Sequence, residues 1–163
     1  MARGGSVWLD CTLGTGGLWC RRRHVKPLPK TDHSLLLRTN FSEDAGWTAL
    51  CEAIRRPSED GFTASIDGVS DPDYDALTIE QLVVLCPKGG DRRFAFIADR
   101  STFTDSERPI LVVDLNDEPG RAFRVIPSEM WGVENNLSIA NMDFREFAES
   151  VDPDGVFRGF PQR

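Results

Sequence analysis

The chain has 163 residues, of which 40% are hydrophobic, and a formal net charge of −7 at pH 7. A chain of this length buries about two-thirds of the surface that its unfolded form exposes, so a single domain can form a core without disulfides or metals. No apolar run approaches the roughly 18–20 residues that span a bilayer, and no secretory signal is recognisable, so we expect a cytoplasmic protein with reduced cysteines.

Residues 1–32 differ from the rest of the chain. They are rich in Gly and Arg, lack a period of 2 or 3.6, and end in a Pro-x-Pro linker, so we expect a poorly ordered basic tail. A translation start at Val25 would remove most of it. The tail carries six basic and two acidic side chains, which leaves residues 33–163 with a net charge of −11. That charge repels nucleic acid and attracts a basic protein.

Residues 33–163 are expected to form one domain, and its elements follow from the sequence pattern. Strands are predicted at 35–41, 62–67, 93–99, 109–115 and 121–126, and helices at 42–54, 78–86, 128–135 and 143–151. The helix at 42–54 has the clearest period, and Thr78 with Gln81 forms a capping-box pattern. The order favours an α+β fold, with a mixed or antiparallel sheet of about five strands and helices mainly on one face.

Two patterns suggest metal sites and fit them poorly. Asp71, Asp73 and Asp75 match the first ligands of a calcium-binding EF-hand loop, but Ala76 and Leu82 stand where that loop requires Gly and Glu. Turn chemistry explains the three aspartates equally well. Four further possible ligands, Cys11, Cys20, His24 and His33, lack the close pairs of a zinc site. We expect no metal and no cofactor.

Catalytic patterns are equally sparse. The Gly-rich segment at 14–17 lacks the Lys-Ser/Thr of a phosphate loop, and a Ser-His-Asp set would need His33 from the edge of the fold. Carboxylate acid–base chemistry, with or without a divalent cation, remains an alternative function. Its weak candidates are Asp99, Asp114 and Glu129, since Asp99 and Asp114 lie near the ends of predicted strands. Salt bridges to arginines are the simpler explanation for them.

The segment 126–147 combines large apolar groups with amides. It is either part of the core or an interface built around Trp131, with Asn135, Asn136 and Asn141 at its rim. We expect Trp131, Glu134 and the three asparagines to contact a partner, and Asp73 and Asp75 to steer a basic one by charge. A homodimer that buries the same segment is a further possibility.

Two segments of the chain carry a resemblance, PKTDHSLLLRT at 29–39 and SEMWGVENNLSIANMDFREFAESVDPDGVFRGF at 128–160. Through them the chain resembles an uncharacterised family of small bacterial proteins that share an SEMWxVENNLSIANMDF-type segment. The resemblance spans about residues 28–160 and implies no activity and no site residues. The layout is also loosely similar to small acidic immunity proteins that neutralise toxins. The leading hypothesis is therefore an acidic protein-interaction domain without catalytic activity, either immunity-like or regulatory.

Overall fold

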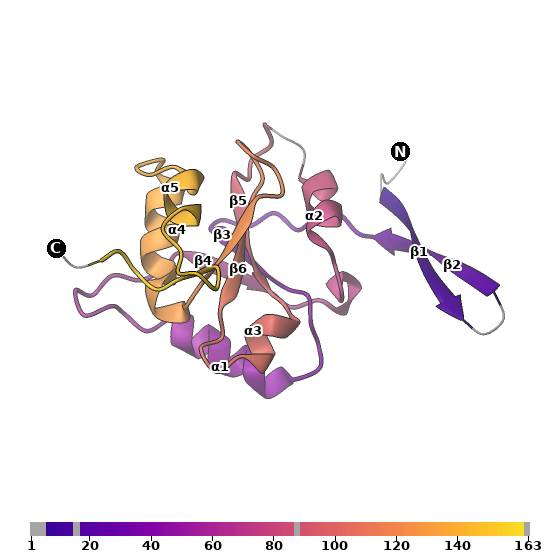
Figure 1. Cartoon of the computed structure of the whole chain (residues 1–163), viewed down its shortest axis with the longest axis horizontal. Coiled ribbons are helices and arrows are strands. Elements are labelled where there is room, and N and C mark those ends of the chain that lie inside the picture. The colour runs from indigo at the N-terminus through magenta and orange to yellow at the C-terminus, as the bar shows by residue number, and fades with distance from the viewer. Residues whose placement is uncertain (1–5, 15–16, 87–88, 162–163) are drawn as a thin grey trace. The chain divides into compact units, whose positions relative to one another are not determined.

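The computed structural model describes residues 6–14, 17–86 and 89–161, which fall into two units, Met1–Lys30 and Thr31–Arg163 (Figure 1). In the first unit, β1 (Ser6–Gly14) pairs with β2 (Gly17–Val25) as an antiparallel two-stranded sheet. This unit corresponds to the basic segment 1–32, whose poor order in solution stays a prediction.

The second unit is built on one mixed sheet. In the order β4-β3-β5-β6-β7-β8, its strands span Ile66–Val69, Ser34–Arg38, Phe94–Ala98, Ile110–Asp114, Ala122–Val125 and Val156–Phe157. β3 runs parallel to β4 and β5, and β7 runs parallel to β8, whereas β6 is antiparallel to both of its neighbours. The expected α+β fold is confirmed, with six strands rather than about five.

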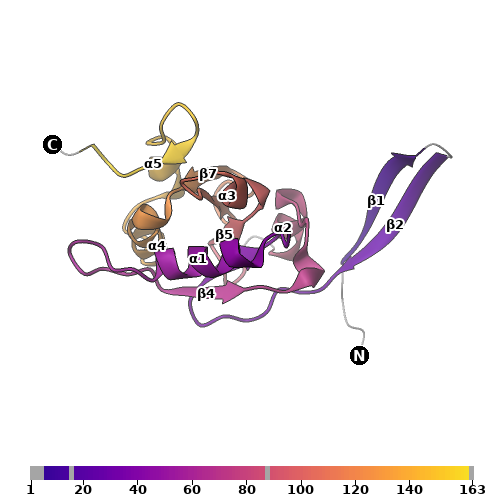
Figure 2. The same ribbon diagram turned by 90° about the horizontal axis from the view of Figure 1, so that it is seen from below.

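The helices cover the two faces of this sheet unequally. α1 (Asp44–Ile54), α4 (Met130–Ser138) and α5 (Phe144–Ala148) contribute to the larger core on one face, while α2 (Ile79–Leu85) covers the other (Figures 1 and 2). Helices therefore lie mainly on one face, as the sequence predicts.

Alternation along the strands divides the apolar side chains between these faces. Leu36, Phe96 and Val112 belong to the larger core, where the rings of Phe123, Phe144, Phe147 and Phe157 pack edge to face or stack. Ile97, next to Phe96 in β5, points instead toward Leu82 of α2. Both faces of the central strands are therefore buried.

The connection from β3 to β4 and the connection from β4 to β5 lie on opposite faces of the sheet. From β3 the chain passes through α1 to β4 on one side, and from β4 it passes through α2 to β5 on the other side. Thr39, which follows β3, and Asp99, which follows β5, therefore lie at the carboxyl ends of two neighbouring parallel strands.

Side-chain caps set several helix starts. The capping box of Thr78 and Gln81 is present at α2, as predicted, and Asp143 with Glu146 forms another at α5. Asp99 and Thr102 form a third at the short helix α3 (Arg100–Thr104). No helix is predicted for this segment from the sequence, because five residues are too few to show a period.

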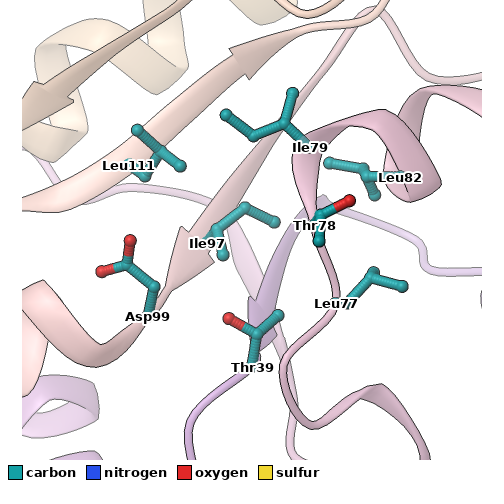
Figure 3. A pocket seen from close by; sticks show the side chains of 8 residues that line it. All are labelled: Thr39, Leu77, Thr78, Ile79, Leu82, Ile97, Asp99 and Leu111. Atoms are coloured by element: carbon teal, nitrogen blue, oxygen red, sulfur yellow. The ribbon is translucent and has the colours of Figure 1, made fainter. Parts of the chain in front are cut away.

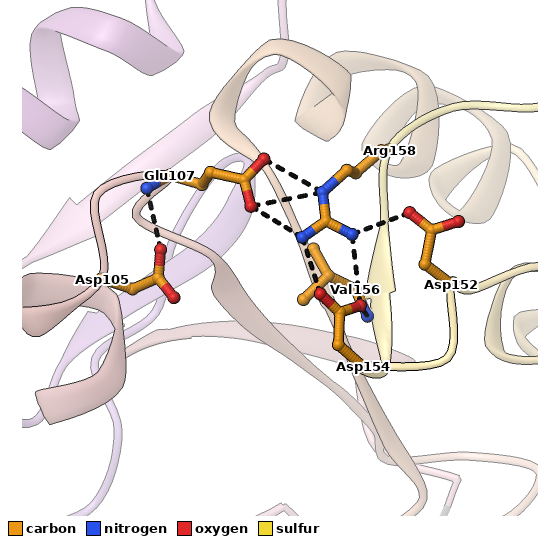
Figure 4. A network of polar contacts seen from close by, with 6 residues as sticks. All are labelled: Asp105, Glu107, Asp152, Asp154, Val156 and Arg158. Carbon is orange, nitrogen blue, oxygen red and sulfur yellow. Dashed lines mark hydrogen bonds and ion pairs between the residues drawn. The ribbon is translucent and has the colours of Figure 1, made fainter.

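The last strand is held by a cluster of charges. Arg158 donates to Glu107 at 2.6 Å, to Asp152 at 2.7 Å and to Asp154 at 2.7 Å (Figure 4). These bonds join the segment around β8 to the loop before β6.

The helices in the described part of the chain are too short or too polar to span a bilayer.

Candidate functional site

Trp131 lies on α4 and stacks against Phe62, a residue of the loop between α1 and β4. The ring centroids are 5.0 Å apart and the ring planes differ by 10°. Phe62 is 52% exposed, and Trp131 is half-buried and outside the larger core. We call this surface, with Asn135 one helical turn beyond Trp131, the Trp131–Phe62 face.

The loop that carries Phe62 is held by its own hydrogen bonds. Ser58 N donates to Phe62 O at 2.8 Å, Gly61 N donates to Ser58 O at 2.9 Å, and Phe62 N donates to the hydroxyl of Ser58 at 3.1 Å. Gly61 adopts a φ of +83°, which a glycine tolerates without strain. The loop therefore presents Phe62 in a defined position. Its tip also carries the exposed acids Glu59 and Asp60.

The asparagines of the segment serve largely to end α4. Asn136 Nδ2 donates to Gly132 O at 2.7 Å, and Asn141 Nδ2 donates to Asn136 Oδ1 at 2.6 Å. The left-handed residue after the helix is Ala140. The side chains of Asn136 and Asn141 thus bond each other and the helix, while the half-buried Asn135 shares the exposed side of α4 with Trp131.

Glu134 lies inside the domain, although it was expected at the contact surface. Its side chain is nearly inaccessible, with the residue 2% exposed, and its carboxylate accepts from Ser34 Oγ at 2.8 Å and from Ser65 N at 3.0 Å. It links α4 to the start of β3 and to the residue before β4. The Trp131–Phe62 face therefore contains Phe62 in place of Glu134. Phe62 itself was missed because its strand-like alternation pointed to a position in the sheet.

The acidic loop after β4 forms a short 3-10 helix, η1 (Pro72–Tyr74). The carboxylate of Asp71 accepts from Asp73 N at 3.0 Å, an arrangement typical of ordinary turns. Asp73 is exposed and Asp75 half-buried. No cluster of three or more His, Cys, Asp or Glu side chains suited to a metal ion is found in the described part of the chain.

The candidate carboxylates lie apart from one another. Asp99 follows the carboxyl end of β5, whereas Asp114 pairs with Phe94 at the opposite end of that strand. Glu129 lies farther along, on the 3-10 helix η2 (Pro127–Glu129) after β7. The structure does not bring Asp99 and Asp114 together, and each has structural partners of its own.

Asp99 caps α3 and pairs with Arg124, whose guanidinium donates to it at 2.6 and 3.1 Å. Burial acts to raise the pKa of Asp99, but the hydrogen bonds from Arg124 and Thr102 together hold that pKa below its usual value. Asp114 accepts from the backbone of the turn after β6. Both carboxylates therefore have the surroundings of structural groups.

Arg38 is a buried cation whose role was not predicted from the sequence. It is 3% exposed, bonds Asp44 at 2.8 Å and the carbonyls of Asn40 and Glu43, and lies over the ring of Phe41. These contacts fix the path from β3 into α1. An arginine amid the leucines of a predicted strand is the one available signal for this role.

Comparison with known protein families gives a match to the larger unit of the chain. A family model described as a domain of unknown function matches residues 33–160. No curated protein matches the chain.

Proposed function

Because the chain belongs to the DUF6924 family, whose function is unknown, we propose from the surfaces of the chain itself that residues 33–163 form a non-catalytic domain that binds a basic partner protein. The stacked, half-exposed pair of Phe62 and Trp131 carries this proposal. The partner contacts the Trp131–Phe62 face.

Rigid aromatic side chains supply large contact area at a small cost in conformational entropy, and Trp is among the residues most enriched at interface hot spots. Here the stacking fixes both rings before a partner arrives, and the bonded loop fixes the backbone beneath Phe62. A preorganised aromatic surface loses little freedom on binding. The face is therefore better suited to docking than a mobile loop would be.

Charge decides the kind of partner. Residues 33–163 carry a net charge of −11, and Glu59 and Asp60 lie in the loop that carries Phe62. An arginine of a partner can stack on an aromatic ring while it bonds a carboxylate. Asp73 and Asp75 add to the long-range attraction. A toxin-like basic protein that this domain neutralises, or a basic protein that it regulates, would have the matching charge.

The test is affinity capture with the full chain and matched variants. Phe62→Ser and Trp131→Ala should lose the captured partner, whereas Val84→Ser, at a residue of 51% exposure on α2, should retain it. The association rate with the purified partner should fall as salt rises. Equal capture by all variants, or a rate that ignores salt, would refute the proposal.

A second copy of the chain is the other candidate occupant of this face, because two partly exposed stacked rings could be buried against a symmetry mate. Light scattering separates the two cases. A dimer that Phe62→Ser converts to a monomer would assign the face to self-association, and a monomeric wild type would leave it to another protein.

A further inference from the structure

A cavity of about 190 Å³ lies between α2 and the sheet, on the face opposite the larger core (Figure 3). Its walls come from four parts of the chain: the end of β3, the end of β5, the start of β6, and the first part of α2 with the segment before it. The lining residues are Thr39, Leu77, Thr78, Ile79, Leu82, Ile97, Asp99 and Leu111. The cavity thus has an apolar wall and a few polar groups, the usual make-up of a small-molecule site.

The cavity lies at the carboxyl ends of two neighbouring parallel strands. Thr39 directly follows β3 and Asp99 directly follows β5. Figure 3 places Thr39 and Asp99 on one side of the cavity and Leu77, Ile79 and Leu82 on the other.

The hydroxyl of Thr39 is the strongest observation in favour of a ligand in this cavity. Thr39 is 5% exposed, and its backbone bonds Ala98 O and Ala76 N at 2.9 and 2.8 Å. Its side-chain oxygen has no hydrogen-bond partner among the residues that the structure describes. Buried hydroxyls are nearly always hydrogen-bonded, so this one requires a partner inside the cavity.

The neighbouring carboxylate defines which groups can fill the cavity. Oδ1 of Asp99 accepts from Thr102 N, from Thr102 Oγ1 and from Arg124, whereas Oδ2 accepts, among the residues that the structure describes, from Arg124 alone. A carboxylate oxygen accepts about two hydrogen bonds, so Oδ2 keeps capacity for one more. The carboxylate oxygen only accepts hydrogen bonds, whereas the hydroxyl of Thr39 can accept or donate, so a ligand that donates hydrogen bonds suits both groups.

We propose that this cavity binds a small aliphatic amine. The ammonium group donates to Asp99 Oδ2 and Thr39 Oγ1, and the alkyl chain packs on Ile79, Leu82 and Leu111. The net charge of −11 on residues 33–163 concentrates cations at the protein surface and disfavours a carboxylate ligand of the same size. This site is independent of the Trp131–Phe62 face.

The test is titration of the full chain with n-butylammonium at neutral pH, followed by the methyl NMR signals of Ile79, Leu82 and Leu111. These signals should shift in a saturable way, and butyrate should leave them unchanged. Signals that ignore n-butylammonium, or that respond equally to butyrate, would overturn the proposal.

Thr39→Val removes the hydroxyl and keeps the shape of the side chain. Because that hydroxyl makes no bond within the described protein, the variant should fold as the wild type does while its affinity for n-butylammonium falls at least tenfold. Thr63→Val, at an exposed threonine outside the cavity, is the matched control and should bind normally. Unchanged affinity in Thr39→Val, or its failure to fold, would contradict the assignment.

Discussion

The carboxylate of Glu134 accepts a hydrogen bond from the hydroxyl of Ser34 at 2.8 Å, across 100 positions of the chain. The same carboxylate accepts from Ser65 N at 3.0 Å. One buried acid thus connects α4, the first residue of β3 and the segment that leads into β4. Hydrogen bonds to a carboxylate are stronger than those between neutral groups, so these two bonds tie the three segments together.

Removal of this acid should destabilise the domain. Glu134→Ala leaves two donors without their acceptor and a hole in the packing, so we expect a loss of about 3 kcal/mol in the free energy of unfolding, measured with urea. Glu134→Gln keeps the shape and should lose about 1 kcal/mol. The exposed Glu149 is a matched control, and Glu149→Ala should change stability by less than about 0.5 kcal/mol. A Glu134→Ala variant as stable as this control would show that the two bonds contribute nothing.

Asp114 should also act through stability. It is 3% exposed, and its carboxylate accepts from the backbone N–H groups of Asn116, Asp117 and Glu118 at 2.8, 3.1 and 2.9 Å. Asp114→Ala should cost about 2 kcal/mol in unfolding free energy, because the turn between β6 and β7 loses all three bonds. Asp117→Ala, in the same turn but exposed, is the control. If Asp114→Asn instead abolished a measurable turnover at unchanged stability, the carboxylate would be catalytic.

Much of the fold could be predicted because its elements carry local signals. The period of Trp47, Leu50 and Ile54 predicted α1, and the pairing of Thr78 with Gln81 predicted the start of α2. β8 could not be predicted, since two residues show no pattern and its position depends on the distant Arg158 bonds. The second strand was expected at 62–67, whereas β4 spans Ile66–Val69.

The candidate site was less predictable, because its residues come from distant segments of the chain. Trp131 stood out as a rare, large residue beside polar ones, but its partner Phe62 depends on a contact between distant segments that no local pattern encodes. Glu134 shows the converse case. On the sequence it was one more acid on an amide-rich helix, and only the positions of Ser34 and Ser65 make it a buried group.

The two described cysteine side chains should react slowly in the folded chain. Burial raises the pKa of Cys86 and of Cys51, which nearby arginines only partly offset. Since the thiolate is the reactive form, both should be labelled by a thiol reagent more slowly in buffer than in urea. Cys86, which is buried, should show the larger difference. Peptide mapping by mass spectrometry measures each rate, and equal rates in both solvents would contradict the expected protection.

The Arg158 cluster should hold the carboxyl-terminal segment in a pH-dependent way. Hydrogen bonds from Arg158 lower the pKa of Glu107 and of Asp154. A carboxylate with a lowered folded-state pKa stabilises the fold above its unfolded pKa, which is about 4 for these groups, and loses that effect as pH falls through the lower folded value. The contribution of Arg158 should therefore be complete at neutral pH and fade below about pH 4.

Arg158→Met tests this by leaving three clustered acids without their cation. At pH 7 the variant should exchange backbone amide hydrogens around β8 faster than the wild type, and the difference in melting temperature between the two should shrink as pH falls below about 4. High salt should also reduce it, because the cluster is solvent-accessible. Arg100→Met, at an exposed arginine that begins α3, should show neither effect. A difference from the wild type that stayed constant from pH 7 to pH 3 would mean that Arg158 acts by packing and not by charge.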